Sequence, residues 1–174
     1  MDHLFIINPA AGKKDSTEAL ERLLERLPFP RKIVHTAREG DARRMTEAAA
    51  ALGKPIRIYA CGGDGTLNEV VNGAAGHDFL AVTNVPMGTG NDFLKLFGPN
   101  YRSIFSNLEA LAAGPQAAFD LMDCNGKLGL DVICAGVDAR IAAGVHKYMV
   151  LFLLDHLSQQ ILGLLVQRFG RVRV

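Results

Sequence analysis

The sequence predicts an α/β fold, in which a parallel β-sheet is flanked by helices. Short apolar runs alternate with segments whose apolar residues recur at helical spacing. Two of the runs, Ile56–Cys61 and Phe79–Val85, are each followed by a glycine-rich loop. Because the carboxyl ends of parallel strands share one edge of a sheet, we expect the two loops to form a single site.

Each element of this fold has its own signal. Apolar and β-branched runs bounded by turn residues predict four strands, at Leu4–Ile7, Ile33–Thr36, Ile56–Cys61 and Phe79–Val85. Apolar residues at helical spacing predict four helices, at Asp15–Leu27, Asp41–Leu52, Leu67–Asn72 and Ser103–Ala113. Pro28 and Gly53 would stop the first two helices, and Asp41 would cap the second.

The chain changes character near residue 119. Apolar runs on either side of Asn125-Gly126 predict a β-hairpin, since this dipeptide favours the tight turn that joins two antiparallel strands. The pattern of Ala139–Phe169 is largely helical. A further strand is expected to start at Arg171, where the sequence stops, and this indicates an incomplete lobe. We therefore expect an α/β domain over residues 1–118 and the truncated start of a second, β-rich lobe over residues 119–174.

Composition limits which binding partners and which cellular compartment we expect for this protein. The 174 residues are 49% hydrophobic with a net charge of +1, which is enough apolar material for one core and gives no basic excess for nucleic acid. The sequence has neither a secretory signal pattern nor an apolar run of membrane-spanning length, so cytoplasmic residence is the expectation. The three cysteines lack C-x-x-C spacing, which favours free thiols over a disulfide framework or a zinc site.

The most informative stretch is Gly62–Glu69, which follows an apolar strand and opens an apolar helical pattern. Glycines lack a Cβ, so the amides of this turn can approach phosphate oxygens, and the helix N-terminus behind them adds unpaired donors. An aspartate here, Asp64, would cost about 3 kcal/mol at roughly 5 Å from a phosphate charge and an effective dielectric near 20. A divalent cation such as Mg²⁺ would offset that repulsion, or Asp64 only caps the helix.

Three motifs carry a resemblance to a known family. The glycine stretch has neither G-x-G-x-x-G nor G-x-x-x-x-G-K-[ST] spacing, so it is not one of the two commonest nucleotide-binding motifs. The chain instead resembles the catalytic-domain family of diacylglycerol kinases, which includes sphingosine and ceramide kinases and bacterial soluble lipid kinases. The resemblance rests on Asn8-Pro9-Ala10-Ala11-Gly12, Gly62–Gly73 and Pro86–Phe93. The Gly-Gly-Asp-Gly core alone is also similar to NAD kinases and phosphofructokinases, and the other two motifs favour the first family.

The resemblance implies an ATP site and a magnesium site. The residues it places around ATP are Asn8, Pro9, Gly12, Lys13, Thr36, Gly62, Gly63, Asp64, Gly65, Thr66, Asn68, Glu69, Gly88, Thr89 and Asn91. Asp64, Asp92 and Asp120 match acidic positions that bacterial members link to a magnesium and water network, and Asp64 is the expected catalytic residue. From residue type alone, Asn8 could be a turn former, Thr36 a strand-end residue and Asp92 a helix cap.

The implied reaction is ATP-dependent transfer of the γ-phosphoryl group to a lipid hydroxyl, such as that of diacylglycerol, at a membrane surface. Only 55 residues, Asp120–Val174, remain for the lipid-binding lobe, and the family's acidic proton acceptor has no counterpart. We therefore expect a fragment, or a short form that cannot complete the reaction alone, with exposed apolar surface that promotes homo-oligomers. The alternatives are a non-catalytic nucleotide-binding module and an NAD kinase-like enzyme.

Overall fold

A computed structural model describes residues 1–12 and 16–131 of the protein, and the backbone of residues 167–173. Its elements follow one another as β1 (Asp2–Ile7), α1 (Ser16–Glu25), β2 (Lys32–His35), α2 (Asp41–Ala50), β3 (Ile56–Gly62), α3 (Asp64–Ala74), β4 (Leu80–Pro86), α4 (Asp92–Lys95), α5 (Tyr101–Ser106), α6 (Leu108–Ala113), β5 (Ala118–Cys124), β6 (Lys127–Gly129) and β7 (Gln167–Arg173). The predicted α/β fold is confirmed.

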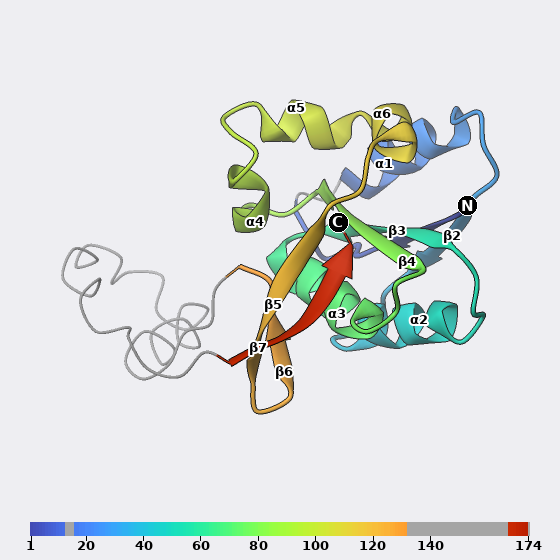
Figure 1. The fold of residues 1–174 in the computed structure, drawn as a ribbon. Helices are drawn as coiled ribbons and strands as arrows, with labels where there is room; N and C mark the ends of the chain where they lie inside the picture. The colour runs from blue at the N-terminus through green and yellow to red at the C-terminus, as the bar shows by residue number, and fades with distance from the viewer. Residues whose placement is uncertain (13–15, 132–166, 174) are drawn as a thin grey trace.

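The strands form one sheet in the order β2-β1-β3-β4-β7-β5-β6 (Figure 1). The first four in this order run parallel, and their register sets Ile7 beside both His35 and Cys61, and Cys61 beside Val85. The four strands therefore end level with one another, and the loops after them start from one edge. Beyond β4 the sheet continues through β7, which is parallel to β4 and antiparallel to β5.

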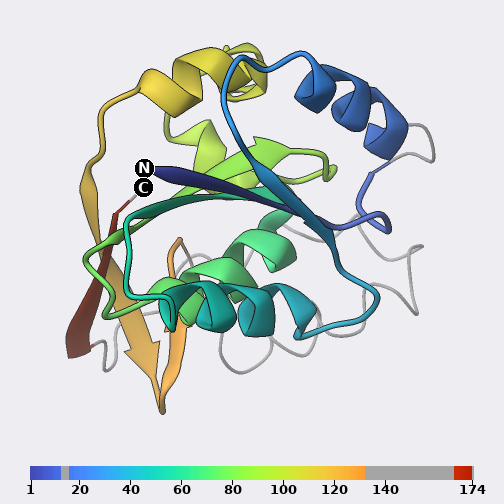
Figure 2. The same cartoon turned by 90° about the vertical axis from the view of Figure 1, so that its right-hand side faces the viewer.

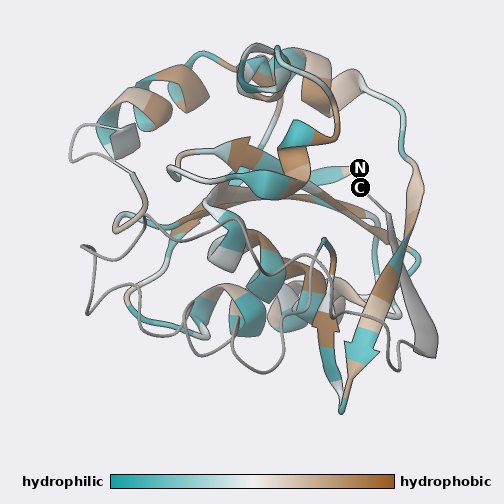
Figure 3. Cartoon of the chain, turned by 90° about the vertical axis from the view of Figure 1, so that its left-hand side faces the viewer, coloured by the Kyte–Doolittle hydropathy of each residue, from teal (hydrophilic) through white to brown (hydrophobic). Residues whose placement is uncertain are grey.

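Helices cover both faces of the sheet (Figures 1 and 2). The helices α1, α5 and α6 lie on one face, and α2 and α3 lie on the other. The central strands are buried on both sides and are largely apolar, as Figure 3 shows, although β3 and β4 also bury Arg57, Thr83 and Asn84. Leu4 and Ile6 of β1 belong to the core beneath α2 and α3, whereas Phe5 and Ile7 belong to the core beneath α1 and α6.

Two predicted helix features are wrong. The helix expected over Ser103–Ala113 is broken into α5 and α6 at Asn107, whose side-chain oxygen accepts the Ala110 amide at 3.1 Å and so begins a new helix. The N-cap of α2 is Gly40 and not Asp41. Asp41 instead closes the turn before the helix, because its Oδ2 accepts the amides of Ala37 and Arg38 at 2.8 and 3.1 Å.

The predicted hairpin is confirmed, and the helical pattern after it is wrong at its end. Asn125 and Gly126 join β5 to β6 with φ angles of 53° and 79°, the left-handed values that a tight two-residue turn requires. Residues 167–169, expected to be helical, lie in β7, because β5 provides antiparallel backbone partners for Gln167 and Arg168. The rest of the helical pattern lies outside the described residues. Among the described residues, no helix is long and apolar enough to cross a membrane.

Candidate functional site

The loops after β1, β3 and β4 meet at the carboxyl edge of the sheet with their backbones in contact. A Cβ on Gly88 would lie 2.5 Å from the Cα of Gly63, and a Cβ on Gly12 would lie 2.1 Å from the carbonyl oxygen of Met87. Neither position can hold a side chain unless the facing backbone moves. The glycines of all three motifs are therefore required for the loops to approach one another, which explains why they recur at the ends of separate strands.

The first loop is held against the start of α3. The Asn8 amide donates from Nδ2 to Thr66 Oγ1 at 3.0 Å, and Asn8 Oδ1 accepts the Ala10 amide at 3.0 Å. Thr66 in turn covers Gly62, where a Cβ would lie 2.3 Å from Thr66 Oγ1. Asn8 is thus both the turn former that its residue type suggested and the tie between two of the loops.

Asp64 joins the second loop to the third. Its Oδ2 accepts the amide of Asn91 at 2.8 Å, and its Oδ1 accepts the amide of Asp92 at 2.6 Å. Gly90 lets this happen, since a Cβ there would lie 2.6 Å from Asp64 Oδ2. The carboxylate therefore bridges the first turns of α3 and α4. Two amides already compensate its charge, while each oxygen keeps a second lone pair for water or a cation.

Asn91 shapes the third loop from inside. It is buried, adopts a left-handed backbone with φ of 55°, and donates from Nδ2 to the carbonyl oxygen of Gly88 at 2.7 Å. Its Oδ1 is buried without a hydrogen-bond partner.

The start of α3 has no side-chain cap. Its N-cap residue is Gly63, which has no side chain to accept the first amides of that helix, and nothing lies within 4 Å of a Cβ built on Gly65. The start of α3 thus offers open, uncapped amide donors at the loop junction.

A group of carboxylates lies beside this junction. Asp92 forms an ion pair with Lys95, and this carboxylate raises the pKa of Lys95 through their hydrogen bond. Partial burial raises the pKa of Asp131, and the charges of Asp92 and Asp64 raise it further. Asp131 was not predicted from the sequence, because no motif or strand end marks it. A divalent cation such as Mg²⁺ would relieve the repulsion that Asp64 and Asp92 exert on Asp131.

Asp120 belongs to the second half of the sheet. It lies on β5 opposite Arg171 of β7, next to a β-bulge. Within the described residues, no three side chains of His, Cys, Asp or Glu are gathered closely enough to bind a metal by themselves. The magnesium roles of Asp64, Asp92 and Asp120 therefore stay predictions, in which phosphate oxygens and water would complete the shell.

Two other residues of the central motif make structural contacts. Glu69 accepts the amides of Gly40 and Ala42 at 2.9 and 3.1 Å, one with each carboxylate oxygen, and so caps α2 from α3. The Asn68 side chain accepts Asn72 Nδ2 at 3.3 Å along the same helix. Contacts of these side chains with a nucleotide remain predictions.

The remaining predicted site residues lie at the margins of the loop junction. Thr36 follows β2, and its amide donates to the carbonyl oxygen of Ile7 at 2.9 Å, which places it beside the first loop. Pro9 is exposed on that loop, and Lys13 lies outside the described residues. The edge that carries Thr36 and the first loop is therefore continuous with the glycine junction.

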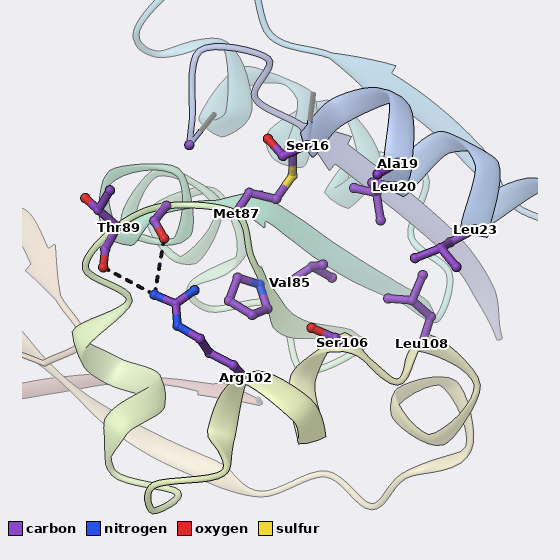
Figure 4. Close-up of a pocket in the computed structure, with 13 residues that line it drawn as sticks. Ser16, Ala19, Leu20, Leu23, Val85, Met87, Thr89, Arg102, Ser106 and Leu108 are labelled. Carbon is purple, nitrogen blue, oxygen red and sulfur yellow. Dashed lines mark hydrogen bonds between the residues drawn. The ribbon is translucent and has the colours of Figure 1, made fainter. Parts of the chain in front are cut away.

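A cavity of about 560 Å³ adjoins the loops on the α1 side of the sheet (Figure 4). Gly12, Gly88 and Thr89 border it, and Arg102 of α5 closes one end by donating from Nη2 to the carbonyl oxygens of Thr89 and Gly88 at 3.3 and 3.5 Å. Arg102 was not predicted from the sequence, because its position depends on the path of the chain after β4, which no local pattern encodes.

Comparison with known proteins identifies the family. Residues 2–124 match the family model for the diacylglycerol kinase catalytic domain. The chain is 38% identical over 115 residues to a "Probable lipid kinase YegS-like" of Pseudomonas aeruginosa, covering 64% of this chain and 36% of that protein. It is 31% identical over 135 residues to a "Diacylglycerol kinase" of Bacillus subtilis, covering 75% of this chain and 44% of that protein.

A solved structure gives the same result. The crystal structure of a putative diacylglycerol kinase from Bacillus anthracis matches with a TM-score of 0.58 and 29% identity, covering 73% of this chain and 47% of that one. The chain thus spans less than half the length of these three proteins. The family model covers well over half of this sequence, and the chain belongs to the diacylglycerol kinase catalytic-domain family, a family of lipid kinases.

Proposed function

We propose that this chain is the nucleotide-binding part of an ATP-dependent lipid kinase, which transfers the γ-phosphoryl group of ATP to a lipid hydroxyl such as that of diacylglycerol. The observation that carries the proposal is the junction of the glycine loops, where Asp64 holds the third loop against the uncapped N-terminus of α3. A helix N-terminus whose backbone is accessible is a favourable site for phosphate oxygens.

Each group at the junction has a part in the proposed chemistry. The amides of Gly63–Thr66 would bind the phosphate chain, and Gly88 and Thr89 would limit its position from the other side. Asp64 would hold the two loops in register, so that the transferred phosphoryl group is aligned. Magnesium, held by Asp64, Asp92 and Asp120 with water and phosphate oxygens, would neutralise charge that develops during transfer.

The acceptor side of the reaction is proposed from the family. Proteins of this family named as diacylglycerol or lipid kinases support a lipid acceptor, which the enzyme would meet from the cytoplasm at the inner membrane face. The acidic residue that accepts the hydroxyl proton has no counterpart in these 174 residues. Because the chain spans 36% and 44% of two curated relatives, the whole reaction is proposed for a longer polypeptide with a complete second lobe.

A second candidate is a nucleotide-binding module without catalysis. It is favoured by the length of the chain, which spans 36% and 44% of two curated relatives. An NAD kinase-like enzyme is a third candidate, because the Gly-Gly-Asp-Gly core alone does not separate the two families of kinases.

Two assays separate these candidates. Titration calorimetry of the 174-residue chain with MgATP tests binding, and transfer of ³²P from ATP to diacylglycerol vesicles or to NAD tests the reaction. We expect binding by the chain, and lipid transfer by the longer polypeptide. Binding without transfer by the longer polypeptide would support the module, and labelled NADP with unlabelled lipid would support NAD kinase.

The matched variants are Asp64→Asn and Asp78→Asn. An asparagine at 64 keeps one acceptor oxygen and presents an NH₂ group to the second amide, so we expect transfer to fall at least a hundredfold, with some loss of stability. Asp78 is exposed in the loop before β4, at the opposite edge of the sheet, and its substitution should leave transfer unchanged. Equal turnover by both variants would contradict the role given to Asp64.

A further inference from the structure

The cavity between α1 and α5–α6 has two chemically different ends (Figure 4). At one end lie Thr89 and the guanidinium of Arg102, and at the other lie the aliphatic side chains of Leu20, Leu23 and Leu108. Its volume of about 560 Å³ is within the range of about 300–1,000 Å³ that small-molecule sites occupy. The cavity is therefore large enough for a ligand of its own.

The aliphatic end continues along α1. A second cavity of about 260 Å³ shares Leu23, Ser106 and Leu108 with the first. It extends past Leu27 to a polar end that is lined by Arg26, Asn107 and Glu109. Leu23 remains 50% exposed although it lines both cavities, whereas Leu20 and Leu108 at the base are 6% and 5% exposed. The two cavities together form an elongated groove, and a ligand that covered Leu23 would remove apolar surface from water.

The charge at the other end selects an anion. Arg102 is the one charged side chain among the described residues that line the larger cavity, and it forms no ion pair with any described residue. Its two bonds to the loop both use Nη2, which leaves Nε and Nη1 as donors. A guanidinium with two free donor positions matches the paired oxygens of a carboxylate or phosphate.

We propose that this groove binds an anionic amphiphile with a single aliphatic chain. The oxyanion lies at Arg102, and the chain runs along Leu20, Leu23 and Leu108 between α1 and α6. A nucleoside fits less well, because the aliphatic end provides the Ser106 hydroxyl and little else to pair with the hydrogen-bonding edge of a base. The cavity borders Gly12, Gly88 and Thr89 of the proposed nucleotide site, but Gly63–Thr66 are not part of its lining, and the proposal does not depend on kinase activity.

Titration calorimetry on the 174-residue chain tests this directly. The probes are octanoate, decanoate and dodecanoate below their micelle concentrations, with decyl phosphate, decyltrimethylammonium, inorganic phosphate and adenosine. We expect affinity to rise about fourfold for each added methylene group until the groove is filled. Decanoate and decyl phosphate should both bind, and the trimethylammonium compound should bind at least tenfold more weakly. The ratio of decanoate to decyl phosphate affinity tells which acid group the site prefers.

Three variants tie binding to this groove. Arg102→Gln should weaken decanoate and decyl phosphate at least tenfold, with little change for the cationic amphiphile. Leu23→Gln should weaken all chains and flatten the dependence on chain length, and Leu52→Gln is its control, because Leu52 is 62% exposed at the end of α2. Ala19→Phe, at an exposed position that lines the groove, should fill it and abolish binding while the protein keeps its melting temperature.

Several results would overturn the proposal. One is the absence of binding by any chain length, and another is equal binding of anionic and cationic amphiphiles. A third is equal loss in Leu23→Gln and Leu52→Gln, which would mean nonspecific adsorption. Binding of inorganic phosphate alone, or of adenosine that Ala19→Phe blocks, would assign the cavity to a phosphate or nucleoside ligand instead.

Discussion

Asp64 is the residue on which the candidate site depends most. The sequence placed it inside a glycine turn, where a lone carboxylate next to a phosphate is unfavourable and calls for a compensating group. The structure adds that two backbone amides, from Asn91 and Asp92, compensate the charge before any cation does. These partners could not be predicted, because they come from the next strand-loop unit and no local pattern links them to Asp64.

Glycine substitutions separate folding from binding. Gly88→Ala places a Cβ against the backbone of Gly63, so we expect the free energy of unfolding to fall by about 1–3 kcal/mol. Gly65→Ala meets nothing within 4 Å and should leave stability unchanged or raise it by up to about 1 kcal/mol. Urea denaturation measures both, and equal stability of the two variants would contradict the close contact of the loops.

The Gly65→Ala variant also tests the proposed phosphate site. If a phosphate oxygen approaches the amide of Gly65, a methyl group there obstructs it, so MgATP affinity should fall at least tenfold in Gly65→Ala despite its intact fold. Calorimetry checks this, and wild-type affinity in Gly65→Ala would place the phosphate elsewhere.

The cysteines should differ in reactivity. Cys61 is fully buried on β3, and burial raises the pKa of its thiol, so the reactive thiolate is scarce. Cys124 is exposed at the end of β5. Iodoacetamide labelling of the native protein, followed by mass spectrometry of each cysteine peptide, should modify Cys124 and leave Cys61 untouched; rapid labelling of Cys61 would contradict the burial of β3.

At the scale of elements, the strands and most helices were predictable from periodicity. The hydrogen bonds and strand pairings that join distant elements were not. The apolar runs of β1, β3 and β4 are buried on both faces and gave a clear signal. The break between α5 and α6 has a local cause, the Asn107 cap, which the apolar pattern of the two helices obscured. The strand character of residues 167–169 depends on partners in β5, far away in the sequence, so a local pattern indicated a helix instead.

Glu69 is expected to stabilise the pairing of α2 with α3. It supplies two acceptors to the start of α2, whose own N-cap is a glycine without a side chain. Glu69→Ala should therefore lower the free energy of unfolding by about 1–2 kcal/mol. Urea denaturation checks this against Glu47→Ala on the exposed side of α2, which should change stability by less than about 0.5 kcal/mol. Equal effects would contradict the capping role.

Asp41 should make the start of α2 sensitive to acid. The amide of Ala37, followed by the side chain of Arg44 and the amide of Arg38, lowers the pKa of Asp41 to about 2. Since the unfolded value is about 3.9, the stabilisation is complete above pH 4 and is lost as the pH falls toward 2. The urea midpoint of wild type should therefore fall more steeply over this window than that of Asp41→Asn. Parallel curves would contradict the assignment.

At the scale of the whole molecule, the parallel half of the sheet carries the site, and the other half contains antiparallel strand pairs. The parallel direction of β2-β1-β3-β4 was predictable, because strands that alternate with helices favour a parallel sheet, whereas the order of these strands was not predicted. The insertion of β7 between β4 and β5 was not, since it pairs strands more than forty residues apart in sequence. This insertion fixes the hairpin of β5 and β6 next to the parallel sheet. The division into domains at residue 119 stays a prediction.

The central claim is that the amides at the start of α3 bind the phosphate chain of a nucleotide. A crystal structure of the chain with a non-hydrolysable ATP analogue and Mg²⁺ tests it most directly. We predict phosphate oxygens within about 2.7–3.2 Å of the amides of Gly63–Thr66, with the metal on the side of Asp64 and Asp92. A triphosphate bound at another surface, with these amides still facing solvent, would contradict the account.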